Sequence, residues 1–301
     1  MKFIKKNFLF IICLCWGIIT LFSINSGINE RIAMEDKGLV NLKNNCLKNY
    51  NHYQGEAKAT CDKIINGEEI NTRKNFYIKF SEVQTENIRN LAILCPLILI
   101  IISSYEVNTI FKSKIALLML KRESYFTFLK KVFKKMYRYV FMFPVFMLLV
   151  FLICSLNSSF DTKTVLNSLL VFGDLKTGPV FYVVAYIINI LFFSAFYLNL
   201  TLIVMRKQHN YFLLVIESFL LLIAIQLFLE VVVNGIIFNK IINSSIGLVF
   251  NILNGFTFNL ANASIPITLL FSFSCFIITS IIVYLRYKNK EQLVIDCEKN
   301  N

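Results

Sequence analysis

The chain alternates long apolar runs with shorter polar stretches. Six of these runs are long enough for a helix that crosses a bilayer, which needs roughly 20 apolar residues. Backbone N–H and C=O groups must be paired inside lipid, so each run should be helical. The pattern therefore predicts an all-α polytopic membrane protein with six transmembrane helices, at residues 8–24, 91–111, 139–156, 180–204, 211–233 and 265–285.

The first run has a second interpretation. It follows Lys2, Lys5 and Lys6, and a basic start before an apolar stretch is also typical of a cleaved secretory signal. The run is somewhat long for a signal, and no Ala-x-Ala-like cleavage site follows it. We expect it to remain as the first span. Cleavage would remove that span and leave the orientation of the other five unchanged.

Composition agrees with a membrane protein, and the charges predict its orientation. Hydrophobic residues make up 56% of the chain and charged residues only 16%, against roughly a quarter in soluble proteins. The N-terminus, the 112–138 and 205–210 connections and the 286–301 tail together carry eighteen Lys and Arg, whereas the 157–179 and 234–264 connections carry three. Short connections rich in Lys and Arg stay in the cytoplasm. Both termini are therefore expected inside, in a protein of the plasma membrane.

Residues 25–90 form the largest segment between predicted spans and are expected outside the cell as a small domain. This segment contains Cys46 and Cys61, the only cysteines expected on that side. In oxidising surroundings such a pair can close a disulfide. Two free thiols are the alternative, and we favour the disulfide.

The 234–264 segment mixes apolar pieces such as "IGLVFNIL" with Asn, Gly and Ser. It is too apolar for an ordinary loop and too interrupted to cross cleanly. Irregular backbone at membrane depth must be covered by protein or water. We therefore expect short re-entrant helices that pack against the bundle.

Sequence motifs of several enzyme classes are missing. The chain has no GxxxxGK[ST] nucleotide loop, no HExxH motif and no Cys/His cluster with zinc spacing. Of its two histidines, His52 falls in the expected external segment and His209 in a cytoplasmic turn. We expect no catalytic, metal or cofactor-binding site, and no nucleic-acid partner.

Glu217 lies six residues into the fifth predicted span. A charge inside a membrane is costly and is by default a functional hypothesis. The structural alternative, which we favour, is that Glu217 faces the bundle, protonated or paired with a cytoplasmic Lys or Arg. Asn189, Asn199 and Gln226 are expected to form hydrogen bonds between helices.

The 112–138 connection carries nine Lys and Arg and is longer than a change of direction requires. Its second part predicts an amphipathic helix at the membrane surface, held by anionic headgroups. The expected apolar face carries Phe126, Leu129, Phe133, Met136 and Val140. The expected basic face carries Lys130, Lys131, Lys134, Lys135 and Arg138. This interpretation leaves 112–124, with its own apolar run, unexplained.

The stretch "SYEVNTIFKSKIALLMLKRESYFTFLKK" resembles the region after the second span in type-2 permease subunits of ATP-binding-cassette (ABC) transporters. The acid at the inner helix end in that family is matched by Glu106. The Arg, aromatic, hydrophobic and Lys run that follows is matched by Arg122, Tyr125, Phe126, Leu129 and Lys130. The layout of six spans with an external segment after the first is also similar.

The resemblance implies that 112–124 docks onto a separate ATPase subunit and that two permease chains pair around a path. The residues implied in docking are Glu106, Lys112, Lys114, Lys121, Arg122 and Tyr125. The activity implied is export of an amphipathic antimicrobial peptide, drug or lipid, with ATP hydrolysed by the partner. The alternative is a membrane immunity or sensor protein that binds a ligand through its external segment.

Overall fold

A computed structural model describes residues 2–66, 74–86, 90–112, 115–156, 158–160, 179–208, 210–242, 250–256 and 265–299 of the chain. Within these ranges the chain is helical, apart from connections and one isolated bridge between Asn75 and Ser159. The α-helices are α1 (Lys2–Asn49), α2 (Glu56–Ile65), α3 (Phe76–Glu86), α4 (Cys95–Lys112), α5 (Ile115–Arg122), α6 (Tyr125–Tyr137), α7 (Met142–Ser155), α9 (Pro179–Met205), α10 (Tyr211–Phe228), α11 (Ile265–Tyr287) and α12 (Lys290–Lys299). The 3-10 and π-helical pieces are η1 (Tyr50–His52), η3 (Asn90–Leu94), η4 (Arg138–Phe141), η5 (Leu229–Ile242) and η7 (Leu253–Phe256).

Within the described residues, five helical stretches are long and apolar enough to cross a membrane. The protein is therefore a multi-pass membrane protein, as the apolar runs predicted. The five stretches are Leu91–Phe111, Tyr125–Ser155, Val180–Met205, Tyr211–Ile242 and Ile265–Tyr287. The predicted first span, 8–24, lies within α1, where the side chains of residues 2–10 fall outside the description, and it stays a prediction.

Two helices are longer than the predicted spans. The third was expected to begin at residue 139, but α6, η4 and α7 follow one another without a break from Tyr125. The fifth was expected to end at residue 233, but η5 continues α10 to Ile242. The first nine residues of the expected re-entrant segment thus belong to the preceding helix. Apolar residues continue past Asn234, and a single Asn or Gly does not end a helix.

The chain divides into two compact units. The first, called the bundle unit, comprises Met1–Cys13, Asn87–Leu148 and Val171–Asn301. The second, called the α1–α3 unit, comprises Leu14–Glu86 and Leu149–Leu170. Each is described by itself below.

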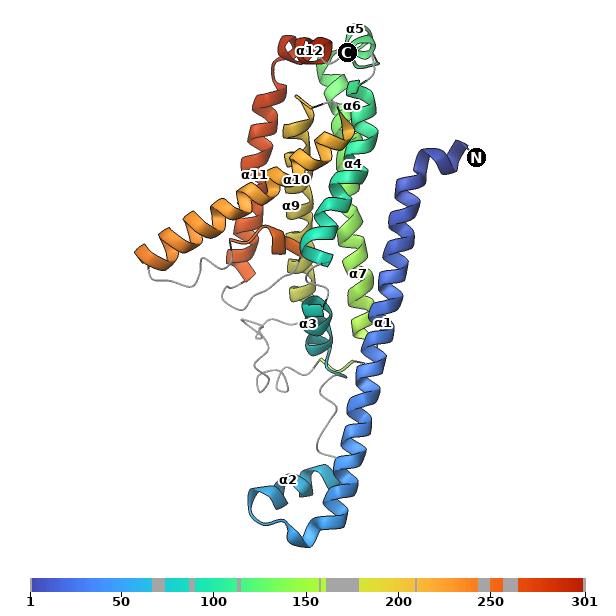
Figure 1. Cartoon of the computed structure of the whole chain (residues 1–301), viewed down its shortest axis with the longest axis vertical. Helices are drawn as coiled ribbons and strands as arrows, with labels where there is room; N and C mark the ends of the chain where they lie inside the picture. The colour runs from blue at the N-terminus through green and yellow to red at the C-terminus, as the bar shows by residue number, and fades with distance from the viewer. Residues whose placement is uncertain are drawn as a thin grey trace. The chain divides into compact units, whose positions relative to one another are not determined.

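In the bundle unit, α9 lies at the centre and packs against α4, α10 and α11 (Figure 1). Its side chains are the most enclosed of any candidate span. Lipid tails are as apolar as leucine, so membrane helices associate through close packing and hydrogen bonds. Both are present on α9, where Tyr186, Phe193 and Tyr197 are buried beside the polar Asn189 and Asn199.

The short helix η7 packs against α9, as expected for part of the re-entrant segment. Its backbone is held by polar side chains from two spans. Asn189 Nδ2 donates to the Gly255 carbonyl at 2.9 Å, and Gln226 Oε1 accepts from the Ile252 N–H at 2.8 Å. Tyr197 also donates to the Ile252 carbonyl at 2.5 Å. Asn189 and Gln226 therefore bind backbone of this segment. The remaining parts of it, 243–249 and 257–264, lie outside the described residues.

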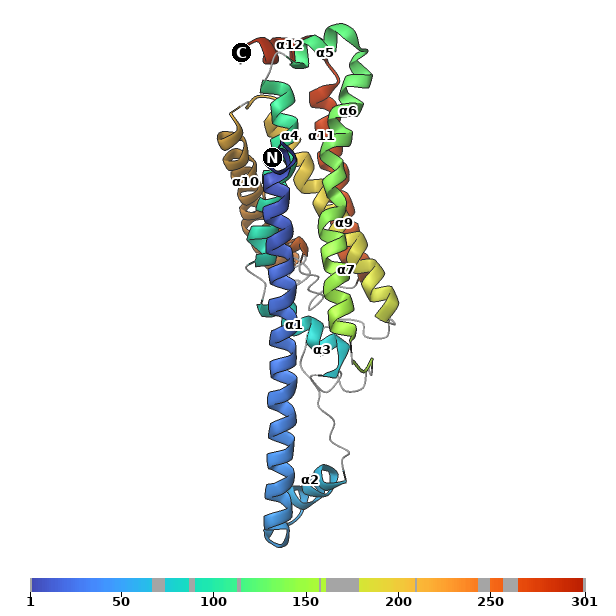
Figure 2. The ribbon, with the colours of Figure 1, turned by 90° about the vertical axis from the view of Figure 1, so that its right-hand side faces the viewer.

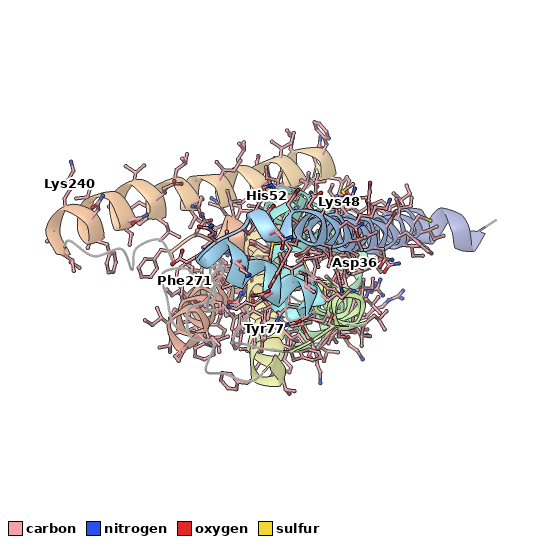
Figure 3. The ribbon with its side chains drawn as sticks, turned by 90° about the horizontal axis from the view of Figure 1, so that it is seen from below. Asp36, Lys48, His52, Tyr77, Lys240 and Phe271 are labelled. Atoms are coloured by element: carbon pink, nitrogen blue, oxygen red, sulfur yellow. A yellow bond between two sulfur atoms is a disulfide. The ribbon has the colours of Figure 1, made fainter. Side chains whose placement is uncertain are left out.

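The helix formed by α10 and η5 is, together with α11, the most exposed of the candidate spans. Near its start α10 packs against α4 and α9, but η5 has no buried residue. Figure 3 shows Lys240 near the far end of this helix, pointing away from the other helices of its unit. The stretch from Leu229 to Ile242 is thus only partly covered, with Phe238 meeting Phe250 at 5.0 Å between ring centroids.

In the α1–α3 unit, α1 continues to Asn49 without a break at residue 24, the expected end of the first span. The chain then turns through η1, and α2 lies back against the end of α1 (Figure 2). Cys46 of α1 and Cys61 of α2 form a disulfide, with their Cα atoms 5.5 Å apart. The bridge is buried beside Ile64 and Tyr53. The pairing is the one that the sequence favoured.

We expect mass spectrometry of the non-reduced protein to find one peptide pair joined through Cys46 and Cys61. Replacing both with Ser should expose α2 to proteolysis, because the closed loop loses its constraint on the unfolded chain. The exposed Cys15 is free and serves as the reference thiol, alkylated without reduction. Two alkylated thiols at 46 and 61 would contradict the bridge.

A buried lysine stabilises the other end of this unit. Lys79 of α3 is 2% exposed. Its Nζ donates to the Leu156 carbonyl at 3.0 Å and to Ser158 Oγ at 2.8 Å, just beyond the end of α7. Burial lowers the pKa of the Lys79 ammonium, with Lys74 adding repulsion and Cys154 acting against both. The stacked rings of Phe80 and Phe151, 4.5 Å apart, pack α3 against the same stretch of chain.

The lowered pKa of Lys79 predicts a pH dependence. The unfolded chain binds this proton more tightly than the folded one, so stability should rise with pH between the lowered pKa and the ordinary value of 10.5. Lys79→Met should abolish that part of the rise, since it keeps the stem and removes the titrating group. The measurement is the unfolding temperature of both proteins in detergent across alkaline pH. Identical pH profiles for the two would contradict the assignment.

Candidate docking surface at the end of the bundle

One end of the bundle unit gathers α5, the start of α6 and α12, as Figures 1 and 2 both show. Helix α5 contacts α4, α6 and α12. The sequence pointed to the α5 region but treated 286–301 as a simple tail. The structure adds α12 to this surface.

Helix α5 has a buried side and an exposed charged end. Ala116 and Leu120 are buried, whereas Leu118 is half exposed. Lys121 and Arg122 occupy the last turn and are exposed. Cations in this position interact favourably with the negative end of the helix dipole. They therefore stabilise α5 while leaving two positive charges at the surface.

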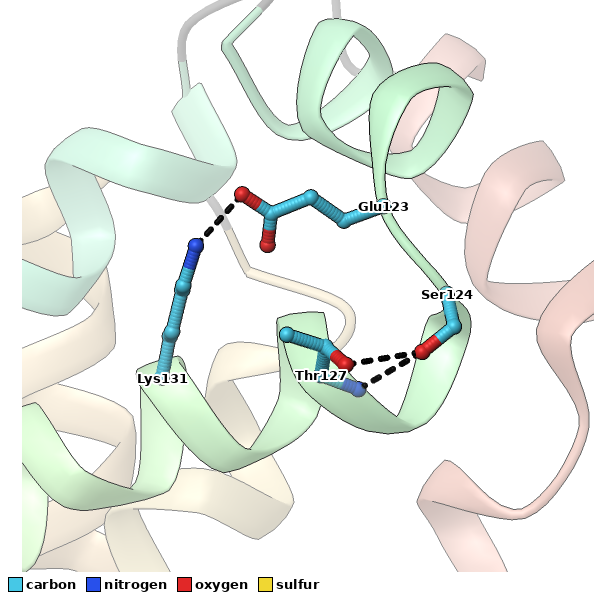
Figure 4. A network of polar contacts seen from close by, with 4 residues as sticks. All are labelled: Glu123, Ser124, Thr127 and Lys131. Carbon is cyan, nitrogen blue, oxygen red and sulfur yellow. Dashed lines mark hydrogen bonds and ion pairs between the residues drawn. The ribbon is translucent and has the colours of Figure 1, made fainter.

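A small polar network fixes the corner between α5 and α6 (Figure 4). Ser124 is the N-cap of α6, and its Oγ accepts from the Thr127 N–H at 3.3 Å. Its hydroxyl also shares a hydrogen bond of 2.8 Å with that of Thr127. Glu123 forms an ion pair with Lys131, which lies one turn beyond Thr127 on α6. This network ties the end of α5 to the first two turns of α6.

The side of α6 that packs against the bundle differs from the predicted apolar, membrane-facing side, which stays a prediction. Phe128, Val132 and Met136 are fully buried, and only Met136 belonged to the predicted face. Phe126, expected on the apolar side, is 77% exposed. The buried side faces α4, where Phe111 and Phe128 meet edge to face with ring centroids 6.1 Å apart. Both faces repeat every three to four residues, so periodicity alone could not choose between them.

Hydrogen bonds join α6 to two other spans. Tyr125 donates to the Tyr287 carbonyl at the end of α11, and Tyr137 donates to Asn199 Oδ1 on α9. Asn199 Nδ2 in turn donates to Thr279 at 3.1 Å and Ser280 at 3.0 Å, both on α11. Asn199 therefore links three helices, which agrees with its predicted role. These contacts fix α6 to the bundle.

Two arginines join the ends of α9 and α11 through reciprocal hydrogen bonds. Arg206 Nη1 donates to the Arg286 carbonyl, and Arg286 Nη1 donates to the Ile203 carbonyl at 2.8 Å. Arg206 Nη2 also donates to Gln292 Oε1 of α12 at 3.0 Å. Sequence reasoning used both arginines only as charges for orientation. A basic residue in the last turn of an apolar helix, or just after it, is a local signal for such C-terminal capping.

The predicted site residues differ in where the structure places them. Lys121 and Arg122 are exposed on the surface, and Tyr125 is turned inward. Glu106 and Lys112 belong to α4, but their side chains lie outside the description, and Lys114 lies outside the described residues altogether. On the basic face, Lys130, Lys131, Lys134, Lys135 and Arg138 are all exposed.

Two of these basic side chains are also engaged locally. Lys131 pairs with Glu123, as described above. Arg138 donates to the Tyr139 hydroxyl at 2.6 Å, with its guanidinium 4.7 Å from the centre of that ring. The basic face therefore contributes to local structure as well as to surface charge.

Glu217 does not face the bundle, which corrects the interpretation that we favoured. It is exposed on α10 and accepts a hydrogen bond from Gln208 Nε2 at 2.9 Å, not from a Lys or Arg. The buried face of α10 carries Leu214, Ser218 and Leu222 instead. Glu217 follows Leu214 by three residues, so spacing allowed a buried position, but the packing of α10 leaves it outside.

Comparison of the chain with protein-family models, curated proteins and solved structures gave no match in any of the three. Among the described residues there is no group of three His, Cys, Asp or Glu side chains that could hold a metal ion. The arrangement at this end of the bundle is a basic surface with an internal hydrogen-bonded frame. Such a surface is suited to binding.

Proposed function

We propose that the chain is the membrane subunit of an ABC transporter of the plasma membrane, which exports an amphipathic peptide, drug or lipid. A separate subunit hydrolyses ATP, and a second permease chain, identical or related, completes the path. The permease itself carries no catalytic site. The surface made of α5, the start of α6 and α12 is the docking site for the ATPase, and this end of the bundle is cytoplasmic.

The observation that supports this proposal is the continuity between the surface and the spans. Lys121 and Arg122 stand exposed at the end of α5, and α6 continues directly into the stretch that ends at Ser155. Tyr125 and Tyr137 bind α6 to α11 and α9. A displacement of α5 by a partner would therefore reach three spans through hydrogen-bonded contacts.

The test is a pull-down of the tagged chain from its native membrane, compared with the Lys121→Glu/Arg122→Glu variant. The wild type should retain a stoichiometric ATPase with a P-loop, and the variant should retain at least about tenfold less. Lys134→Glu/Lys135→Glu is the matched control, because it reverses two exposed charges on α6 and should retain the ATPase. Equal retention by both variants would reject the docking surface, and no ATPase with the wild type would reject the transporter.

A second candidate function is a membrane immunity or sensor protein. The disulfide between Cys46 and Cys61 favours it, because it closes a folded element in the segment expected outside the cell. The same pull-down separates the two functions. A receptor of this class would be recovered without an ATPase and would bind its ligand through the α1–α3 unit.

A further inference from the structure

A pocket of about 520 Å³ lies at the end of the bundle unit where α9 and α11 finish. It is lined by Arg206, Lys207, Arg286, Gln292 and Ile295. Of these five lining side chains, which are the ones that the structure describes, three are cationic and none is acidic. Gln292 and Ile295 come from α12, so the tail helix forms one wall.

The two guanidinium groups are held in place by the protein. Arg206 is only 8% exposed and is fixed by the Arg286 carbonyl and by Gln292. Arg286 is fixed by the Ile203 carbonyl. Capping of two helix ends explains the positions of both arginines. It does not explain Lys207, which adds a third positive charge, or the open volume between these side chains.

We propose that this pocket binds the phosphate group of a phosphoester. A guanidinium matches phosphate with paired N–H donors, and a lysine adds a mobile point charge. An anion would also relieve the repulsion among three cations around one cavity. The volume is in the range of small-molecule sites and exceeds the need of a phosphate alone. The phosphate therefore carries an organic group, for which Ile295 offers an apolar wall.

Two sources could supply this chemistry. Both α9 and α11 are candidate spans, and Arg206 and Arg286 stand at their ends. The headgroup of an anionic phospholipid would therefore lie at the same depth as the pocket. A soluble phosphoester could reach the same site from the aqueous side. The proposal does not depend on an ATPase partner and goes beyond the transport function.

The test is native mass spectrometry of the full chain in mild detergent with phosphatidylglycerol, phosphatidylcholine or glycerol phosphate added. The wild type should retain phosphatidylglycerol or glycerol phosphate over phosphatidylcholine, and Lys207→Gln should bind about tenfold more weakly. Lys288→Gln is the matched control: it removes one exposed charge at the end of α11, outside the pocket, and should bind like the wild type. Ile295→Trp keeps every charge but fills the cavity, and should also weaken binding.

The outcomes distinguish a lipid from a soluble ligand, and they decide whether the pocket binds a phosphate group at all. Selective retention of phosphatidylglycerol identifies a lipid site, and selective retention of glycerol phosphate identifies a soluble ligand. Both results support the pocket if Lys207→Gln and Ile295→Trp weaken binding and Lys288→Gln does not. Equal loss in Lys207→Gln and Lys288→Gln would show attraction by surface charge alone and overturn the proposal. No retention by the wild type, or no effect of either pocket variant, would overturn it as well.

Discussion

Gly255→Ala is expected to destabilise the bundle unit by about 3 kcal/mol, at the upper end of the usual cost of overpacking. A Cβ atom at this position would lie 2.5 Å from Cγ of Phe193 and 2.7 Å and 2.8 Å from its Cδ atoms. The ring of Phe193 is buried and has little room to move. Tyr197 and Phe271 lie against it, with ring centroids 6.2 Å and 6.1 Å away.

The measurement is thermal unfolding in mild detergent. Unfolding is monitored by the reaction of a thiol-specific dye with Cys95 of α4, which is buried in the folded protein. Phe193→Leu combined with Gly255→Ala should recover part of the loss, because the shorter side chain frees the space that the methyl group needs. Gly38→Ala is the control, since nothing lies within 4 Å of a Cβ at that position. An unfolding temperature for Gly255→Ala equal to that of the wild type would contradict the packing of η7 on α9.

The spans could be predicted because lipid imposes a simple rule on the sequence. Each predicted run from 91–111 onward overlaps one of the five apolar helices, since a long apolar run must be helical in a bilayer. Helix ends were less certain. The predicted boundary at residue 139 marked a change in composition, but the backbone continues through it, because basic residues of a surface helix are also good helix formers.

The buried faces could not be predicted to the same degree. On α6 two stripes, offset by one or two residues, satisfy the helical repeat, and contact with α4 decides which is buried. Glu217 shows the same limit, because its exposure depends on how α10 packs. Sequence gives the period of a helix, while its rotation about its own axis depends on neighbours that are distant in the chain.

The reciprocal hydrogen bonds of Arg206 and Arg286 show a further limit of prediction from sequence. The two residues are 80 positions apart. An Arg at a helix end signals capping, but the backbone carbonyl that it binds on the other helix has no sequence signature. The cysteine pair behaved differently. Cys46 and Cys61 stand alone in one segment, so the choice of partners was already narrow. A contact could therefore be predicted where both partners are distinctive side chains, and could not where one partner is ordinary backbone.

Asn199→Leu is expected to destabilise the bundle by about 2 kcal/mol. Hydrogen bonds between membrane helices contribute about 0.6 kcal/mol each on average and up to about 1.7. Asn199 makes three, with Tyr137 of α6 and with Thr279 and Ser280 of α11. Both hydroxyls of α11 also bond to carbonyls of their own helix. Most of the loss should therefore come from the contact with Tyr137.

A double-mutant cycle tests this distribution. Asn199→Leu leaves the Tyr137 hydroxyl without its acceptor, so adding Tyr137→Phe should cost less in that background than in the wild type. Ser280→Ala should have only a small effect in either background. If the proposed docking holds, Asn199→Leu should also retain the ATPase but transport more slowly, because α6 loses its hydrogen bond to α9 and keeps only the Tyr125 contact with α11. The losses of stability are measured by Cys95 labelling. If the losses for Tyr137→Phe and Asn199→Leu simply add, the two residues are not coupled, and this contact does not link the docking surface to α9.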